Sequence, residues 1–137
     1  MANISKPALI ILCLTLAGCG RAKAQSDGNV APETQYRRIT PAQAQGMMSE
    51  LNDYILLDVR TQEEYRERRI YGAVLIPDSE LVKRVEKELT DKNSVILVYC
   101  RSGRRSENAA RTLLKMGYAN VYDFGGIMNW PYETVTD

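Results

Sequence analysis

One cysteine in this sequence has the neighbours that a reactive thiol needs. Cys100 is followed by Arg101, Ser102, Gly103, Arg104, Arg105 and Ser106. The three arginines place fixed positive charge beside the sulfur, and nearby cations favour the thiolate, which is the nucleophilic form of cysteine. Gly103 permits backbone angles that a tight loop requires. We therefore predict that Cys100 is a nucleophile. The alternative is a structural cysteine in apolar surroundings, a common state of a free thiol.

The segments around Cys100 are predicted to place it at a strand-to-helix junction. Residues 95–99 are large, apolar and partly β-branched, which is typical of a buried strand. From Ser106 to residue 116 the apolar side chains recur at helical spacing, and Gly117 stands where such a helix ends. Unpaired backbone N–H groups and the helix dipole meet at this junction, and both favour an anion.

The rest of the chain alternates between strand and helix patterns. Further strands are predicted over residues 36–39, 54–59, 73–76 and 120–123. Capping boxes at Thr40–Gln43 and Thr61–Glu64 predict two helices, the first with Pro41 at its first position and an end near Glu50. A third helix is predicted from a Ser79 cap to Leu89. Its expected buried side chains are Leu81, Val82, Val85 and Leu89. Repeated strand–helix units predict a mostly parallel sheet covered by helices on both faces.

Composition excludes several classes of function. The chain has no histidine, so catalysis by a Cys–His pair and most metal sites are excluded, and we predict neither metal nor cofactor. Lys and Arg number 18 and Asp and Glu 17, a balance that argues against nucleic-acid binding. The cysteines are Cys13, Cys19 and Cys100.

Four segments together resemble the rhodanese (sulfurtransferase) family. Tyr99 to Ser106 resembles the family's active-site loop. The other segments are Leu57-Asp58-Val59-Arg60 with Glu63-Glu64-Tyr65, Ile70 to Pro77, and Val121 to Trp130. They occur in the family's order and spacing, and the resemblance spans from about Tyr36 to the end of the chain. It implies a three-layer α/β domain whose five-stranded sheet has the order 1-5-4-2-3.

The resemblance also implies a reaction and a set of site residues. Cys100 would take the outer sulfur of thiosulfate or a similar small anionic donor as a persulfide and pass it to a thiol or to cyanide. The residues implied in donor binding are Arg101, Ser102, Gly103, Arg104, Arg105 and Ser106. Asp58 and Arg60 either support this loop or form a structural ion pair. Arg69 stands where the family often has histidine, which affects the expected contacts at the substrate mouth.

Two other functions remain open at this point. Cysteine phosphatases and arsenate reductases have a related loop, but their arginine stands six residues after the cysteine. Here that position is Ser106, and Arg105 falls one residue earlier. The other alternative is a tethered persulfide carrier or binding module without rapid turnover.

The amino-terminal residues resemble a lipoprotein signal. Lys6 precedes an apolar run over residues 8–17, which is too short to span a bilayer, and Leu16-Ala17-Gly18-Cys19 resembles a bacterial lipobox. We predict a signal peptide at 1–18, a lipidated flexible tether at 19–35 and the rhodanese-like domain at 36–137. Cys19 would then anchor an exported protein to the membrane at the periplasmic face, and Gly20 favours the outer membrane where the host has one. An ordinary secretory signal, cleaved near residues 22–24, is the alternative.

Overall fold

The computed structural model describes residues 35–137. The predictions of a signal peptide, a lipidated Cys19 and most of the tether lie outside these residues and stay predictions. Within the described part, no helix is both long and apolar enough to cross a membrane.

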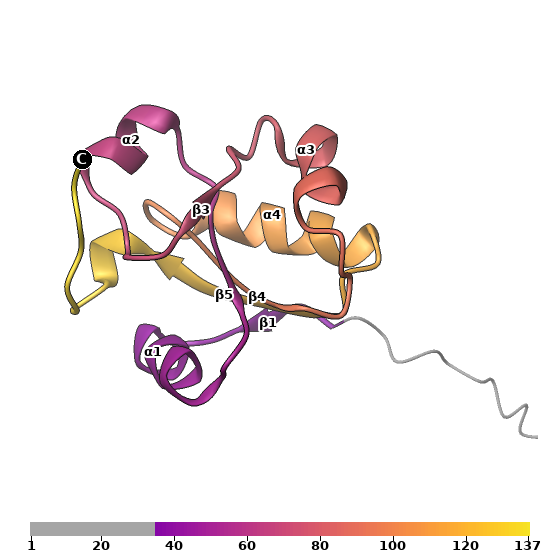
Figure 1. The fold of residues 1–137 in the computed structure, drawn as a ribbon, viewed down its shortest axis with the longest axis horizontal. Coiled ribbons are helices and arrows are strands. Elements are labelled where there is room, and N and C mark those ends of the chain that lie inside the picture. The colour runs from indigo at the N-terminus through magenta and orange to yellow at the C-terminus, as the bar shows by residue number, and fades with distance from the viewer. Residues whose placement is uncertain (1–34) are drawn as a thin grey trace, which may run out of the picture. The chain divides into compact units, whose positions relative to one another are not determined.

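Five parallel strands form one sheet at the centre of the described domain (Figure 1). They are β1 (Arg37–Arg38), β2 (Ile55–Asp58), β3 (Val74–Leu75), β4 (Val95–Cys100) and β5 (Asn120–Gly126). Their order across the sheet is β1-β5-β4-β2-β3, and each pairing is parallel. This confirms the predicted fold class and strand order. β4 lies at the centre because its residues are apolar on both faces.

Helices cover both faces of the sheet and make the domain three-layered. Helices α3 (Leu81–Glu88) and α4 (Arg104–Lys115) pack on one face. Helix α1 (Pro41–Glu50) and the short 3-10 helix η1 (Ile127–Asn129) pack on the other, and Figure 1 shows α1 opposite α3 and α4. Helix α2 (Gln62–Glu67) follows β2 and contributes Tyr65 to the second cluster.

The alternation of side chains along β4 decides which way Cys100 points. Ile96, Val98 and Cys100 belong to the apolar cluster beneath α3 and α4, whereas Leu97 and Tyr99 belong to the cluster on the opposite face. Because successive strand residues point to opposite faces, the last residue of β4 points toward the amino end of α4.

The local start and stop signals read from the sequence are confirmed at three helix ends. Both predicted capping boxes are present, at Thr40–Gln43 for α1 and at Thr61–Glu64 for α2. Gly117 has a φ of 93° after α4. There Tyr118 N–H donates to Leu113 and Gly117 N–H donates to Leu114, which satisfies the last carbonyls of the helix.

Two predicted helix starts and one predicted core residue are wrong. Helix α3 begins at Leu81 with Glu80 as its cap, so Ser79 does not cap it. Val82 is 64% exposed, because in this short helix only the row Leu81, Val85 and Leu89 faces the sheet. Helix α4 begins at Arg104, two residues before Ser106, because Gly103 turns the chain with a φ of 110°.

Candidate active site

Cys100 lies at the carboxyl end of β4, and three residues separate it from the start of α4. The backbone N–H of Gly103, the capping residue of α4, donates to Cys100 Sγ over 3.0 Å. The positive φ of Gly103 lets the chain turn from that N–H directly into α4, and few other residues adopt this conformation. The sulfur therefore meets a backbone donor and the positive end of a twelve-residue helix.

The sulfur is more enclosed than a surface nucleophile would be. Cys100 exposes 1% of its surface and belongs to the apolar cluster beneath α4. That burial is what the structural-cysteine alternative requires. However, Sγ also lies 3.6 Å from Ser106 Oγ and receives the Gly103 N–H, so its immediate surroundings are partly polar. A sulfur-donating substrate must therefore reach Cys100 Sγ with a small terminal atom.

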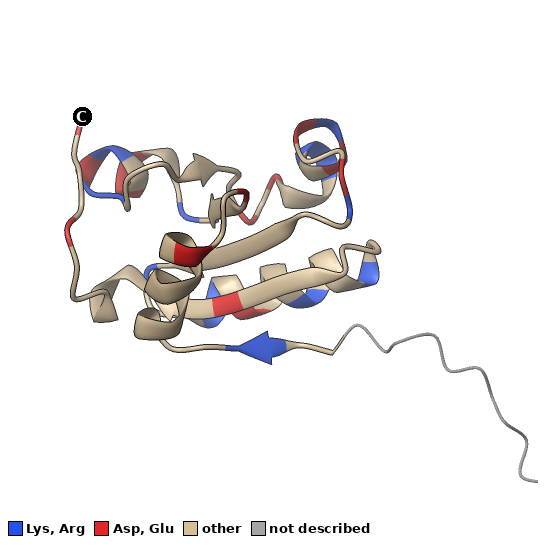
Figure 2. Cartoon of the chain, turned by 60° about the horizontal axis from the view of Figure 1, so that its bottom comes forward, with Lys and Arg blue, Asp and Glu red and all other residues tan. Residues whose placement is uncertain are grey.

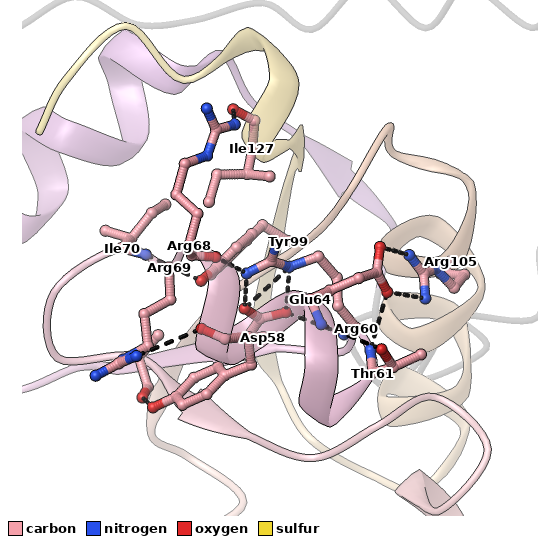
Figure 3. Close-up of polar contacts among 12 residues, drawn as sticks. Asp58, Arg60, Thr61, Glu64, Arg68, Arg69, Ile70, Tyr99, Arg105 and Ile127 are labelled. Atoms are coloured by element: carbon pink, nitrogen blue, oxygen red, sulfur yellow. Dashed lines mark hydrogen bonds and ion pairs between the residues drawn. The ribbon is translucent and has the colours of Figure 1, made fainter. Parts of the chain in front are cut away.

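The predicted donor-binding residues differ in their exposure and in their ion pairing. Arg101, Ser102 and Arg104 are exposed, and neither arginine forms an ion pair within residues 35–137. Arg105 is different, because its guanidinium donates to both oxygens of Glu64, over 2.8 and 2.7 Å. Figure 3 shows this pair beside the Asp58–Arg60 pair.

Ser106 is fully buried and supports the loop from below. Its hydroxyl lies 3.0 Å from the carbonyl oxygen of Gly103 and 3.1 Å from that of Gly125. It thereby links the start of α4 to the end of β5 and holds its own oxygen near the Cys100 sulfur.

A pocket of about 400 Å³ lies beside the cysteine loop. Its lining residues are Arg60, Glu64, Glu67, Arg68, Arg101, Ile127 and Met128. Positively and negatively charged side chains therefore both line this pocket, to which Arg101 and helix α2 contribute. Within residues 35–137, no group of three acidic or cysteine side chains is placed to hold a metal ion.

Asp58 and Arg60 form a buried ion pair. The guanidinium donates to the carboxylate over 2.6 to 3.1 Å, and both side chains are almost fully buried. Arg60 also donates to the carbonyl of Arg68 over 2.6 Å (Figure 3). This geometry ties β2 to the segment after α2, as the structural alternative predicts, although Arg60 also lines the pocket.

A second buried carboxylate, which sequence reasoning missed, lies on β5 and joins the end of that strand to β1. Asp123 is fully buried; its Oδ2 accepts from Arg38 and from the Tyr36 hydroxyl, each over 2.6 Å, and its Oδ1 accepts from Gly125 N–H over 2.8 Å. Figure 2 shows an acidic position on β5 beside the basic edge strand β1. The signal was an aspartate within a predicted strand, where a buried carboxylate needs partners.

Gly126 is the other site residue whose role was not foreseen. It pairs with Cys100 across β4 and β5. A Cβ at this position would lie 2.2 Å from the carbonyl oxygen of Arg101 and 2.5 Å from Cα of Ser102. Only glycine allows β5 and the cysteine loop to approach this closely.

The Glu64–Arg105 pair predicts a specific sensitivity to acid. The hydrogen bonds from Arg105 lower the pKa of Glu64 from its ordinary value to about 2, helped by the Thr61 N–H. Its contribution to stability is therefore complete above the unfolded pKa, about 4.5, and is lost as the pH falls toward 2. We expect the free energy of unfolding to fall by about 1 kcal/mol over this range, since solvent screens the partly exposed pair. Denaturant titration at several pH values measures this; a Glu64→Gln variant with the same acid slope as the unmodified protein would contradict it.

Comparison with known proteins agrees with this geometry. Residues 40–132 match the model of the rhodanese-like domain family. The chain is 39% identical over 71 residues to thiosulfate sulfurtransferase PspE of Escherichia coli, covering 52% of this chain and 68% of that protein. It is 32% identical over 96 residues to thiosulfate sulfurtransferase GlpE of Coxiella burnetii, covering 69% of this chain and 87% of that protein. A solved rhodanese with anions from E. coli aligns with a TM-score of 0.58 and 34% identity, covering 61% of this chain and 99% of that one.

This chain therefore belongs to the rhodanese-like domain family.

Proposed function

We propose that this protein is a rhodanese-type sulfurtransferase that carries a sulfane sulfur on Cys100. The observation that carries the proposal is the Gly103 N–H directed at Cys100 Sγ over 3.0 Å, at the amino end of α4. A backbone donor at that place favours a negatively charged sulfur without any side-chain base. The similarity to two proteins named thiosulfate sulfurtransferases supports the same reaction class.

In the first step, the Cys100 thiolate attacks the outer sulfur of thiosulfate. A new S–S bond forms between Sγ and that sulfur, and the S–S bond of thiosulfate breaks. The bonding pair leaves with sulfite, so the enzyme gains one sulfur as an anionic persulfide. The N–H groups at the start of α4 stabilise the charge on the transferred sulfur.

In the second step, an acceptor attacks the outer sulfur of the persulfide. Cyanide or a thiolate forms a bond to that sulfur, the S–S bond to Cys100 breaks, and its electron pair restores the Cys100 thiolate. The two displacements balance without an oxidant, a reductant or a cofactor. The positive charges of Arg101 and Arg104 would attract the anionic donor and stabilise the departing sulfite.

The phosphatase-like alternative receives less support from the site. A phosphatase loop needs an arginine that is free to grip the oxygens of a tetrahedral oxyanion. Arg105 donates instead to both oxygens of Glu64. The carrier alternative shares the Cys100 persulfide and differs only in turnover.

Trapping of the intermediate tests the proposal. The full chain is incubated with thiosulfate, and its intact mass and Cys100 peptide are measured without reductant. We expect one added sulfur on Cys100, which cyanide removes as thiocyanate. Absence of the added sulfur from the wild-type protein, or its presence on another residue, would refute the assignment.

A further inference from the structure

The positive charge beside Cys100 is smaller than the sequence suggests. Of the three arginines that follow the cysteine, Arg105 is neutralised by a two-point ion pair with Glu64. Both side chains are about a quarter exposed. In the pocket itself, Arg60 is already paired with Asp58, which leaves Arg101 and Arg68 as lining cations that form no ion pair within residues 35–137. Glu64 and Glu67 are the lining carboxylates.

Glu64 stands between Arg105 and the pocket. Its side chain lines the pocket, whereas Arg105 does not belong to the lining. An anionic sulfur donor in this pocket therefore lies against the Glu64 carboxylate and not against the Arg105 guanidinium. The Coulomb repulsion from that carboxylate is twice as large for a doubly charged donor as for a singly charged one.

The position of Glu64 is fixed by the start of α2. Thr61 N–H donates to Glu64 Oε2 over 3.0 Å, and Glu64 N–H donates to Thr61 Oγ1 over 3.3 Å. Figure 3 shows the carboxylate held from one side by Arg105 and from the other by Thr61. Because the low pKa of Glu64, about 2, keeps it charged at any ordinary assay pH, the repulsion is permanent.

We propose that Glu64 is a specificity-determining residue that disfavours dianionic sulfur donors and selects singly charged ones, such as alkyl persulfides and thiosulfonates. The inference rests on the proposed sulfurtransferase function and names the donor class of that site. Glu64 acts through charge: it neutralises Arg105 and presents its own carboxylate to the pocket. Its removal should free the Arg105 guanidinium for a second negative charge on the donor.

Two donors of similar size but different charge provide the test. Thiosulfate carries two negative charges, and methanethiosulfonate replaces one charged oxygen with a methyl group; each gives up its outer sulfur and leaves as sulfite or methanesulfinate. The ratio of kcat/KM for thiosulfate to that for methanethiosulfonate is measured for the full chain and for Glu64→Gln. Glutamine still serves as the third residue of a capping box, so α2 keeps its start.

We expect Glu64→Gln to raise this ratio roughly tenfold, as the loss of one nearby charge implies. Glu63→Gln is the matched control, because it removes the same charge from the neighbouring exposed position of the same helix. It should change the ratio less than about twofold. In the double variant Glu64→Gln/Arg105→Gln the tenfold rise in the donor ratio should disappear, because the guanidinium that Glu64→Gln would free is absent.

A second measurement does not depend on turnover. Sulfate, a dianion, should protect Cys100 from alkylation by iodoacetamide at a roughly tenfold lower concentration in Glu64→Gln than in the wild-type protein. An unchanged donor ratio and unchanged protection in Glu64→Gln, or an equal effect of Glu63→Gln, would overturn the role of Glu64. If neither donor adds sulfur to wild-type Cys100, the proposed function fails instead, and sulfate protection still tests the charge selection.

Discussion

Replacement of Cys100 by serine should lower the rate of sulfur transfer from thiosulfate to cyanide by at least about a thousandfold. The serine hydroxyl is nearly isosteric with the thiol, and it can accept the Gly103 N–H that now reaches Sγ. It stays protonated at neutral pH, however, and an alcohol is a poor nucleophile toward sulfur. The fold should therefore persist while the reaction stops. Initial rates of thiocyanate formation, compared with thermal unfolding of the same samples, measure both.

The matched control is Cys19→Ser, which removes a thiol from a part of the chain that the proposal does not use in transfer. Its turnover in solution should equal that of the wild-type protein. Retention of more than about one per cent of the rate in a folded Cys100→Ser variant would place the transferred sulfur elsewhere.

Substitution of Gly126 by alanine should lower both the free energy of unfolding and the rate of sulfur transfer. Gly126 has a φ of −118°, which any residue adopts, so the effect comes from space alone. The added Cβ would meet the backbone of Arg101 and Ser102 at 2.2 and 2.5 Å, and neither backbone atom can move without shifting the cysteine loop. We expect a loss of about 2–3 kcal/mol in the free energy of unfolding. The rate of sulfur transfer should fall by about tenfold or more, because the hydrogen-bond donor at Gly103 moves relative to Cys100 Sγ.

Gly46→Ala is the control for a glycine-to-alanine change. Gly46 lies within α1, and a Cβ there would have no atom within 4 Å. Because alanine favours the helix, this variant should be more stable than the wild-type protein by about 0.5–1 kcal/mol, with unchanged transfer. Chemical denaturation and thiocyanate assays compare the two variants. If Gly126→Ala had wild-type stability and activity, the prediction would be wrong, because the cysteine loop would then tolerate a displaced β5.

The local elements could be predicted because their causes are local. A capping box needs only two residues that are three positions apart, so Thr40–Gln43 and Thr61–Glu64 predicted the starts of α1 and α2 from the sequence. The apolar run before Cys100 likewise identified β4, and Gly117 identified the end of α4. The strand order came from the resemblance to the rhodanese family, since periodicity does not say which strands are neighbours.

The sequence by itself determined that the Cys100 thiol stands between a buried strand and a helix, among arginines and without histidine. Only the tertiary structure decided how much of that charge faces a substrate. Glu64 and Arg105 are 41 residues apart, and their pairing depends on where the fold places α2 and the first turn of α4. The contacts of Asp123 with Tyr36 and Arg38 and the close approach of Gly126 to Arg101 arise in the same way. Such contacts join segments distant along the chain, so neither composition nor spacing encodes them visibly, and they exist only once the sheet has brought those segments together.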